Sequence, residues 1–176
     1  MQVFERQAPP RNLDGLHDAD HAGCLRTRRS TSCNVIVHGS HVIKMKSTTQ
    51  IPQALSSGES EWYSTAACGA LLIGMRNMAI DYGRTLEARL TGGSTAASGI
   101  AHRRGAGEVR HIETKTLWLQ RLITGRLIVL RQAKGTELSA DLGTKHVERK
   151  DLEKNLRLLG FVIRSGRSAL ALRAAL

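Results

Sequence analysis

The chain has 176 residues, of which 26 are Lys or Arg and 15 are Asp or Glu, so its formal net charge is +11. This length predicts one domain with a buried core, and the 3% aromatic content predicts a core of aliphatic side chains. The positive charge makes nucleic acid the first partner to consider. No stretch is apolar over a membrane-spanning length, and the basic residues are spread out rather than gathered beside an apolar helix.

The cysteines and the N-terminal sequence indicate a cellular compartment. Cys24, Cys33 and Cys68 are an odd number without the spacing of a disulfide framework, which favours a reducing environment. The first residues contain no apolar signal core. We therefore expect an intracellular protein, cytoplasmic or nuclear.

The N-terminal third of the chain predicts a lead-in and three strands. Residues 1–11 are polar and contain two consecutive prolines, which predicts a disordered lead-in. A weak strand is expected over residues 12–17, ending at Asp18, before a Gly- and Arg-rich loop. Residues 33–38 and 41–45 are rich in β-branched residues and flank a Gly-Ser turn signal, so they predict a β-hairpin.

A long helix is expected next. Ser56-Ser57-Gly58-Glu59 has the Ser-x-x-Glu form of a capping box, and apolar spacing of three and four residues continues to residue 81. Glu61 is expected on the same face as Thr65 and Cys68, beside an apolar stripe. The stripe comprises Tyr63, Ala66, Ala67, Ala70, Gly74 and Met78.

Shorter elements are expected in the second half of the chain. They are a strand over 85–90, a helix over 94–104 capped by Ser94, a helix over 113–123, a strand over 127–130, a helical turn capped by Ser139 and a helix over 147–159. The element order predicts a mixed α/β layer fold over residues 12–160. Residues 161–176 form a basic Ala/Leu-rich tail, which a membrane-active segment and unrelated read-through sequence would explain equally well.

Five of the 15 acidic residues occur at three places that could together form one site. Two are the doublets Asp18-Ala19-Asp20 and Glu59-Ser60-Glu61, and the third is Asp141. Clustered carboxylates are what a divalent-metal site on a nucleic-acid enzyme requires, because hard cations prefer oxygen ligands. The same residues would also serve as turn, capping-box and helix-start acids. The residue types alone leave both interpretations open.

Other metal sites fit the spacing less well. A calcium loop starting at Asp18 is excluded, because its twelfth position is Arg29 rather than glutamate. A zinc ion could in principle be ligated by His17, His21 and Cys24 with Cys33 as fourth ligand, but the spacing matches no closed zinc module.

Basic residues in two segments are candidates for phosphate contacts. Residues 88–107 contain no acid, which favours nucleic-acid binding over a merely solvated basic surface. The candidates are Arg28, Arg29, Arg103, Arg104, Arg110 and His111.

Five strings occur in a fixed order between roughly residues 13 and 160. They are Asp-Ala-Asp-His-Ala-Gly-Cys at 18–24, Thr-Arg-Arg-Ser-Thr-Ser at 27–32, Ser-Ser-Gly-Glu-Ser-Glu-Trp-Tyr at 56–63, Arg-His-Ile-Glu at 110–113 and Ala-Asp-Leu-Gly-Thr-Lys at 140–145. Together they resemble the ribonuclease H-like domain at the end of copia-type retrotransposon polyproteins. The ordered set is far more specific than any one string.

The resemblance implies a ribonuclease H-like fold, with a mixed five-stranded sheet flanked by helices. It also implies a nuclease that uses Mg²⁺ or Mn²⁺ to cut the RNA strand of an RNA–DNA hybrid. The catalytic, metal-binding acids of the family correspond to Asp18, Glu61 and Asp141. In the ancestral polyprotein, a reverse transcriptase domain would be the partner.

One acid of the family pattern has no counterpart here. The family string usually reads Thr-Asp-Ser-Ser-Ala-Ala, whereas residues 92–97 read Gly-Gly-Ser-Thr-Ala-Ala, with Gly93 in place of the aspartate. His21 also replaces a tryptophan that usually follows Asp-x-Asp. The resemblance therefore implies a degenerate copy with impaired catalysis. The alternatives are a non-catalytic nucleic-acid-binding module and a non-functional transposon fragment.

Overall fold

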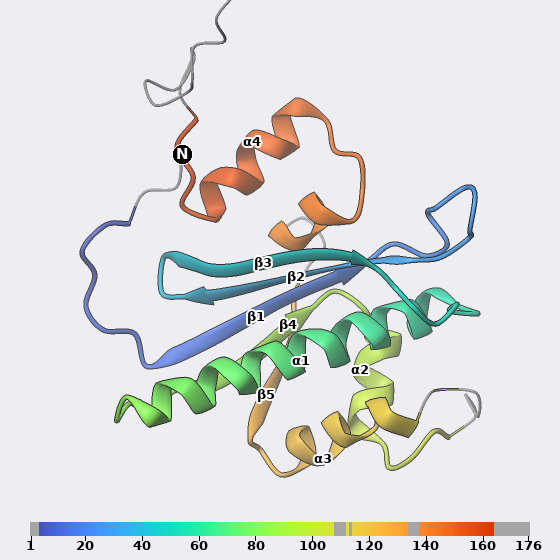
Figure 1. The fold of residues 1–176 in the computed structure, drawn as a ribbon, viewed down its shortest axis with the longest axis horizontal. Coiled ribbons are helices and arrows are strands. Elements are labelled where there is room, and N and C mark those ends of the chain that lie inside the picture. The colour runs from blue at the N-terminus through green and yellow to red at the C-terminus, as the bar shows by residue number, and fades with distance from the viewer. Residues whose placement is uncertain (1–3, 108–111, 113, 134–137, 164–176) are drawn as a thin grey trace, which may run out of the picture.

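The computed structural model describes residues 4–107, 112, 114–133 and 138–163 (Figure 1). In chain order the elements are β1 (Asn12–Ala19), β2 (Thr31–His38), β3 (His41–Thr49), α1 (Ser57–Asp81), β4 (Glu87–Gly92), α2 (Thr95–His102), the 3-10 turn η1 (Thr114–Thr116), α3 (Trp118–Thr124), β5 (Ile128–Gln132), the 3-10 turn η3 (Ser139–Gly143) and α4 (Arg149–Leu158).

The five strands form one mixed sheet in the order β3-β2-β1-β4-β5. β1, β2 and β3 pair antiparallel, whereas β1–β4 and β4–β5 pair parallel. A core cluster including Trp62, Leu72 and Leu90 lies between the sheet and the helices α1–α3. A second cluster, including Val35 and Leu159, lies on the opposite face beneath η3 and α4. The predicted mixed five-stranded sheet flanked by helices is confirmed.

The predicted hairpin is present, and its second strand is longer than expected because β3 continues to Thr49. β1 also extends past the predicted end, so Asp18 lies within the strand and pairs in register with Cys33. At this end of the sheet, the loop after β1 projects outward and α1 begins (Figure 1). The arrangement brings the acids of β1 and α1 to one end of the molecule.

Helix α1 has the predicted bounds, but most of the apolar stripe identified in the sequence is exposed. Tyr63 and Ala66 are buried, whereas Ala67, Ala70, Gly74 and Met78 are exposed. The buried face includes the polar residues Ser64 and Thr65, since Ser64 Oγ donates to the Asp18 carbonyl at 2.8 Å and Thr65 Oγ1 to the Glu61 carbonyl at 2.7 Å. Satisfied hydroxyls of this kind can be buried, so apolar spacing alone does not identify the buried face.

Hydrogen bonds at the start of α1 account for Glu59, one of the two acids in Glu59-Ser60-Glu61. Ser56 Oγ accepts a hydrogen bond from the Glu59 backbone at 3.2 Å, as the capping box predicted. The Glu59 carboxylate accepts from the Leu55 amide at 2.8 Å and from the Tyr63 hydroxyl at 2.7 Å. Glu59 is therefore satisfied as a helix-start residue.

The later elements follow the prediction with two corrections. Ser94 caps α2 as expected, and its hydroxyl accepts from the Ala97 amide at 3.1 Å. The single helix predicted over 113–123 is instead a 3-10 turn, η1, followed by α3. Ser139 does not cap the turn carrying Asp141, because Leu138 occupies the cap position and Ser139 is buried within η3.

Both ends of the described chain contact the domain. Gln7 Nε2 donates to the His38 carbonyl at 3.0 Å, and its Oε1 accepts from the Ser40 amide at 2.9 Å. Phe161 packs against the second core cluster. The division of the chain at residues 11/12 and 160/161 remains a prediction, and most of the basic tail lies outside the described residues. No described helix combines the length and apolar character needed to cross a membrane.

Candidate functional site

The structure brings Asp18, Glu61 and Asp141 together. Asp18 lies near the end of β1, Glu61 in the first part of α1 and Asp141 in η3. The Lys145 ammonium contacts both Asp18 and Asp141. Burial raises the pKa of Glu61 and Asp141, and the nearby charge of Asp18 raises both further. The cluster of these three acids is called the acid cluster below.

Asp18 is the centre of the acid cluster and is 5% exposed. The Thr144 hydroxyl donates to its Oδ2. Lys145 Nζ lies 3.2 Å from Asp18 Oδ2 and 3.4 Å from Oδ1. Because both carboxylate oxygens have a donor, a negative charge on Asp18 is stabilised despite its burial.

Glu61 is in a different electrostatic state. Burial, and then the negative charge of Asp18, raise the pKa of Glu61 to about 8. Its Oε2 is buried without a hydrogen-bond partner among the described residues. His17 Nδ1 lies 3.9 Å from that oxygen, but burial lowers the pKa of His17 to about 4. At neutral pH both side chains are therefore mostly neutral, and their proximity is not an ion pair.

Asp141 shares the cation of Lys145 with Asp18. Burial, and then Asp18, raise the pKa of Asp141, and Lys145 opposes them. The Lys145 ammonium lies 3.2 Å from Asp141 Oδ1. Burial lowers the pKa of Lys145, but the two carboxylates outweigh it and the net change is upward, so the ammonium stays protonated.

The position of Gly93 relative to Asp18 follows from the register of the sheet. The parallel pairing of β1 with β4 ends at Leu16 opposite Thr91. The same register continued by two residues places Gly93 level with Asp18 on the neighbouring chain segment. A β-carbon on Gly93 would meet Leu138, the residue before η3. The position that lacks the expected aspartate therefore directly follows β4, the strand that pairs with β1.

The described residues do not fit a divalent metal as they are arranged. Among the described residues, no group of three or more His, Cys, Asp or Glu side chains is placed to hold a metal ion. Lys145 already contacts two of the carboxylates, and Gly93 offers no donor. The structure groups Asp18, Glu61 and Asp141, and their role as metal ligands stays a prediction.

The alternative zinc site is wrong. His17 faces α1, where its Nδ1 lies 3.5 Å from Thr65 Oγ1. Cys33 packs on the opposite side of the sheet in the second core cluster. Adjacent residues of a strand point to opposite faces of the sheet. Because Cys33 pairs with Asp18, the neighbour of His17, the side chains of His17 and Cys33 lie on opposite faces. His21 and Cys24 lie in the loop after β1.

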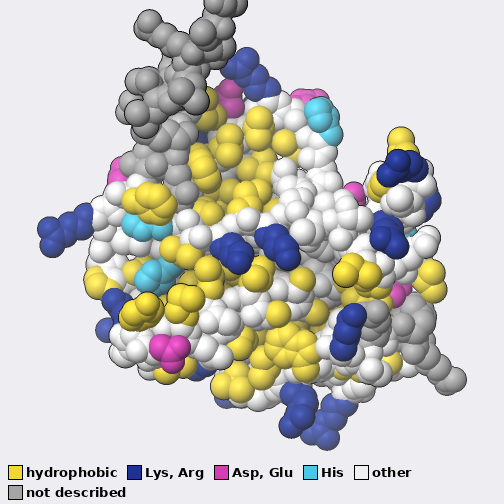
Figure 2. Space-filling view, in the orientation of Figure 1, with side chains coloured by type: hydrophobic (Ala, Val, Ile, Leu, Met, Phe, Trp, Pro, Cys, Tyr) yellow, Lys and Arg dark blue, Asp and Glu magenta, His cyan; other side chains and the backbone are white. Residues whose placement is uncertain are grey.

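The predicted phosphate-binding residues differ in their surroundings. Arg28 and Arg29 are exposed in the loop that projects beyond the end of β1 (Figure 1). Arg104 is exposed, whereas Arg103 is half-buried and donates to the Ala106 carbonyl. Arg110 and His111 lie outside the described residues. Figure 2 shows Lys and Arg side chains projecting from many parts of one face, with few acids among them.

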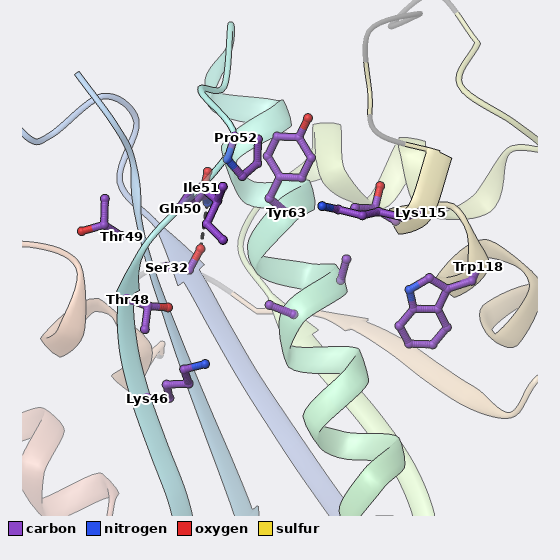
Figure 3. Close-up of a pocket in the computed structure, with 13 residues that line it drawn as sticks. Ser32, Lys46, Thr48, Thr49, Gln50, Ile51, Pro52, Tyr63, Lys115 and Trp118 are labelled. Carbon is purple, nitrogen blue, oxygen red and sulfur yellow. Dashed lines mark hydrogen bonds between the residues drawn. The ribbon is translucent and has the colours of Figure 1, made fainter. Parts of the chain in front are cut away.

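Two adjacent grooves share Trp118. The first, of about 500 Å³, crosses α1 from β3 to α3 and is lined by Lys46, Tyr63, Lys115 and Trp118 among others (Figure 3). The second, of about 820 Å³, includes Arg103, Arg104, Trp118 and Arg121 in its lining. The surface formed by Lys46, Lys115, Trp118, Arg104 and Arg121 is called the Trp118 surface below.

Sequence reasoning missed most of the Trp118 surface and Lys145. Trp118 falls in the helix expected over 113–123 and was not singled out there, but it is 36% exposed at the start of α3. For Lys145 a signal existed, since a lysine four residues after an aspartate forms an ion pair in helical turns. The second partner, Asp18, is far away in sequence and could not be read from spacing.

Comparisons with known proteins identify the fold. The chain is similar to the ribonuclease H1 LC11, isolated from compost by a metagenomic approach, with a TM-score of 0.53 and 12% identity over 83% of this chain and 99% of that chain. It is also similar to the N-terminal RNase H domain of Rv2228c from Mycobacterium tuberculosis, solved as a fusion with maltose binding protein, with a TM-score of 0.51 and 13% identity over 83% and 96% of the two chains. No protein-family model and no curated protein matches the sequence. The chain has a ribonuclease H-like fold.

Proposed function

We propose that this chain is a nucleic-acid-binding domain derived from the ribonuclease H-like domain of a copia-type retrotransposon polyprotein. Its ancestral activity is metal-dependent hydrolysis of the RNA strand of RNA–DNA hybrids, and in this chain that activity is impaired. The observation that carries the proposal is the convergence of Asp18, Glu61 and Asp141, with Gly93 level with Asp18.

The acid cluster supports a nuclease ancestor because, unlike Glu59, its three acids have no evident role in holding the fold together. Glu59 is hydrogen-bonded at the start of α1 and needs no other explanation. In contrast, burial raises the pKa of both Glu61 and Asp141, and the negative charge of Asp18 raises both further. Like charges gathered in this way are typical of functional sites.

Three features of the acid cluster support impaired hydrolysis. Gly93 supplies no ligand, the Lys145 ammonium lies against Asp18, and it also lies against Asp141. Phosphodiester hydrolysis gathers negative charge that must be neutralised with accurate placement, so a misplaced cation costs orders of magnitude in rate.

The Trp118 surface supports retained binding. It combines cations with an aromatic ring beside two grooves. Bases stack on exposed aromatic rings, and cations contact phosphates. Arg28 and Arg29 extend the basic surface at the end of the molecule where the acid cluster lies. We infer that an RNA–DNA hybrid is the ligand, and that the reverse transcriptase domain was the neighbour in the ancestral polyprotein.

A binding and cleavage assay tests both parts of the proposal. The purified chain is mixed with an end-labelled RNA–DNA hybrid in Mg²⁺ or Mn²⁺, with Asp18→Asn as the matched variant. We expect salt-dependent binding by both proteins and cleavage by neither above background. Efficient cleavage that Asp18→Asn abolishes would overturn the impaired state. Absence of binding at low salt would overturn the nucleic-acid role and leave a non-functional fragment as the explanation.

A further inference from the structure

Lys145 stands out among the described basic residues because it contacts two acids of one site. Its ammonium lies 3.2 Å from Asp18 Oδ2 and 3.2 Å from Asp141 Oδ1. The Asp18 side chain is 7% exposed and that of Asp141 is 25% exposed, so the pair is well shielded on its acidic side. Ion pairs on open surfaces contribute little, whereas a cation between two partly buried carboxylates compensates their repulsion.

We propose that Lys145 takes the place of a divalent cation, so that the Lys145 ammonium, rather than a bound metal ion, holds the carboxylates of the acid cluster together. The inference rests on the proposed function, since it assumes that the ancestral cluster bound metal. It goes further by naming the residue that excludes metal from the cluster. Substituting Lys145 by a neutral residue should therefore open the cluster to Mg²⁺ or Mn²⁺.

The turn that carries Lys145 holds it in position. The backbone amides of Thr144 and Lys145 donate to the Asp141 carbonyl at 3.2 Å and 3.1 Å. Ser47 Oγ on β3 donates to the Gly143 carbonyl at 2.5 Å, which anchors the turn to the sheet. The ammonium is thus presented to the acids at a high effective concentration, and a free ion would have to displace it.

The geometry favours the lysine over the free ion. The Lys145 ammonium lies within 3.2 Å of an oxygen of both Asp18 and Asp141, and it reaches them without stripping water from a hydrated metal ion. Mg²⁺ dehydrates reluctantly and needs several well-placed oxygens, and Gly93 contributes none. The side chain of Lys145 is 49% exposed, so its neutral replacement leaves an open path from solvent to the carboxylates.

The test compares Lys145→Met with Lys145→Arg and with Lys150→Met, an exposed lysine at the start of α4 that serves as the matched control. Each full-length protein is stripped with a chelator, and Mn²⁺ and Mg²⁺ binding is measured by calorimetry and by the shift in thermal midpoint. Lys145→Met should bind Mn²⁺ about tenfold or more tightly than wild type, because a repelling unit charge next to the ion is removed. Its thermal midpoint should fall without metal and recover with it. Lys145→Arg and Lys150→Met should behave as wild type.

Two further results decide the inference. Asp18→Asn in the Lys145→Met background should abolish the gained metal binding, which ties the new site to the acid cluster. Wild-type protein that binds Mn²⁺ as tightly as Lys145→Met would overturn the inference, and so would a folded Lys145→Met that binds no metal. If Lys145→Met fails to fold without metal, Lys145→Gln is titrated in its place. None of these readouts uses nucleic acid, so failure here is distinct from failure of hybrid binding or of the cleavage assay.

Discussion

A β-carbon added to Gly93 would lie 3.0 Å from Cδ1 of Leu138. Leu138 is 2% exposed and immediately precedes the turn that carries Asp141. An apolar side chain therefore packs against the place where the family pattern has its third acid. The absence of the acid is accompanied by local packing that suits a glycine, and restoring the acid requires Leu138 to move by a few tenths of an ångström.

Gly93→Asp should restore part of the metal site, and Gly93→Ala is its control because it adds the β-carbon without the carboxylate. Both variants should lose a similar amount of stability, about 1–3 kcal/mol, from crowding against Leu138. Only Gly93→Asp should gain Mn²⁺-dependent stabilisation and cleavage of the RNA strand in a hybrid. Thermal unfolding with and without Mn²⁺, followed by a hybrid cleavage assay, measures both effects.

Gly93→Asp should also depend on the rest of the acid cluster. Asp18→Asn added to it should abolish any cleavage gained, because Asp18 is the central acid of the cluster. Equal metal response in Gly93→Asp and Gly93→Ala would contradict the assignment of residue 93 as the lost ligand position.

Stability should fall as pH rises across the range in which Glu61 titrates. The pKa of Glu61 is raised from 4.5 to about 8, so between these values the unfolded chain carries the ionised side chain and the folded chain does not. The unfolded state then binds fewer protons, and the contribution of Glu61 to stability declines by up to about 1.4 kcal/mol per pH unit. Below pH 4.5 that contribution is fully present.

Glu61→Gln isolates this effect, because the amide cannot ionise. Urea unfolding is measured in the presence of a chelator at several pH values from weakly acidic to weakly alkaline. The free energy of unfolding of Glu61→Gln should increase relative to that of wild type as pH rises. His17 is present in both proteins and its own titration cancels in the difference. Parallel stability curves for the two proteins would contradict the raised pKa.

The sequence predicted the hairpin, the bounds of α1 and the cap at Ser94 because each depends on local turn and capping chemistry. The order of short strings also singled out Gly93 as the position of a lost ligand, and that assignment stays a prediction. The sequence could not predict the ion pair of Lys145 with Asp18, since this contact depends on the packing of η3 against the sheet. The buried face of α1 was missed because buried hydroxyls such as Ser64 resemble solvent-facing residues in sequence.

Arg103 and Arg104 should have separable effects. Arg103 donates to the Ala106 carbonyl and is half-buried, so Arg103→Ala should cost about 0.5–1.5 kcal/mol of stability. Arg104 is exposed in the second groove, so Arg104→Ala should leave stability nearly unchanged. It should instead weaken hybrid binding and reduce the slope of log affinity against log salt by about 1. Fluorescence anisotropy over a salt titration measures the slope, and an unaltered slope would remove Arg104 from the interface.

Trp118 should report nucleic-acid binding by its fluorescence. The chain has 2 tryptophans, and Trp62 is fully buried with its Nε1 donating to Thr116 Oγ1 at 2.8 Å, whereas Trp118 is 36% exposed between the two grooves. Stacking of a base on Trp118 should quench only that indole. Trp118→Leu should abolish the quenching and weaken hybrid binding by about 1–3 kcal/mol, the usual contribution of one stacked base. If quenching persists in Trp118→Leu, the signal comes from Trp62 and the ligand does not bind at the Trp118 surface.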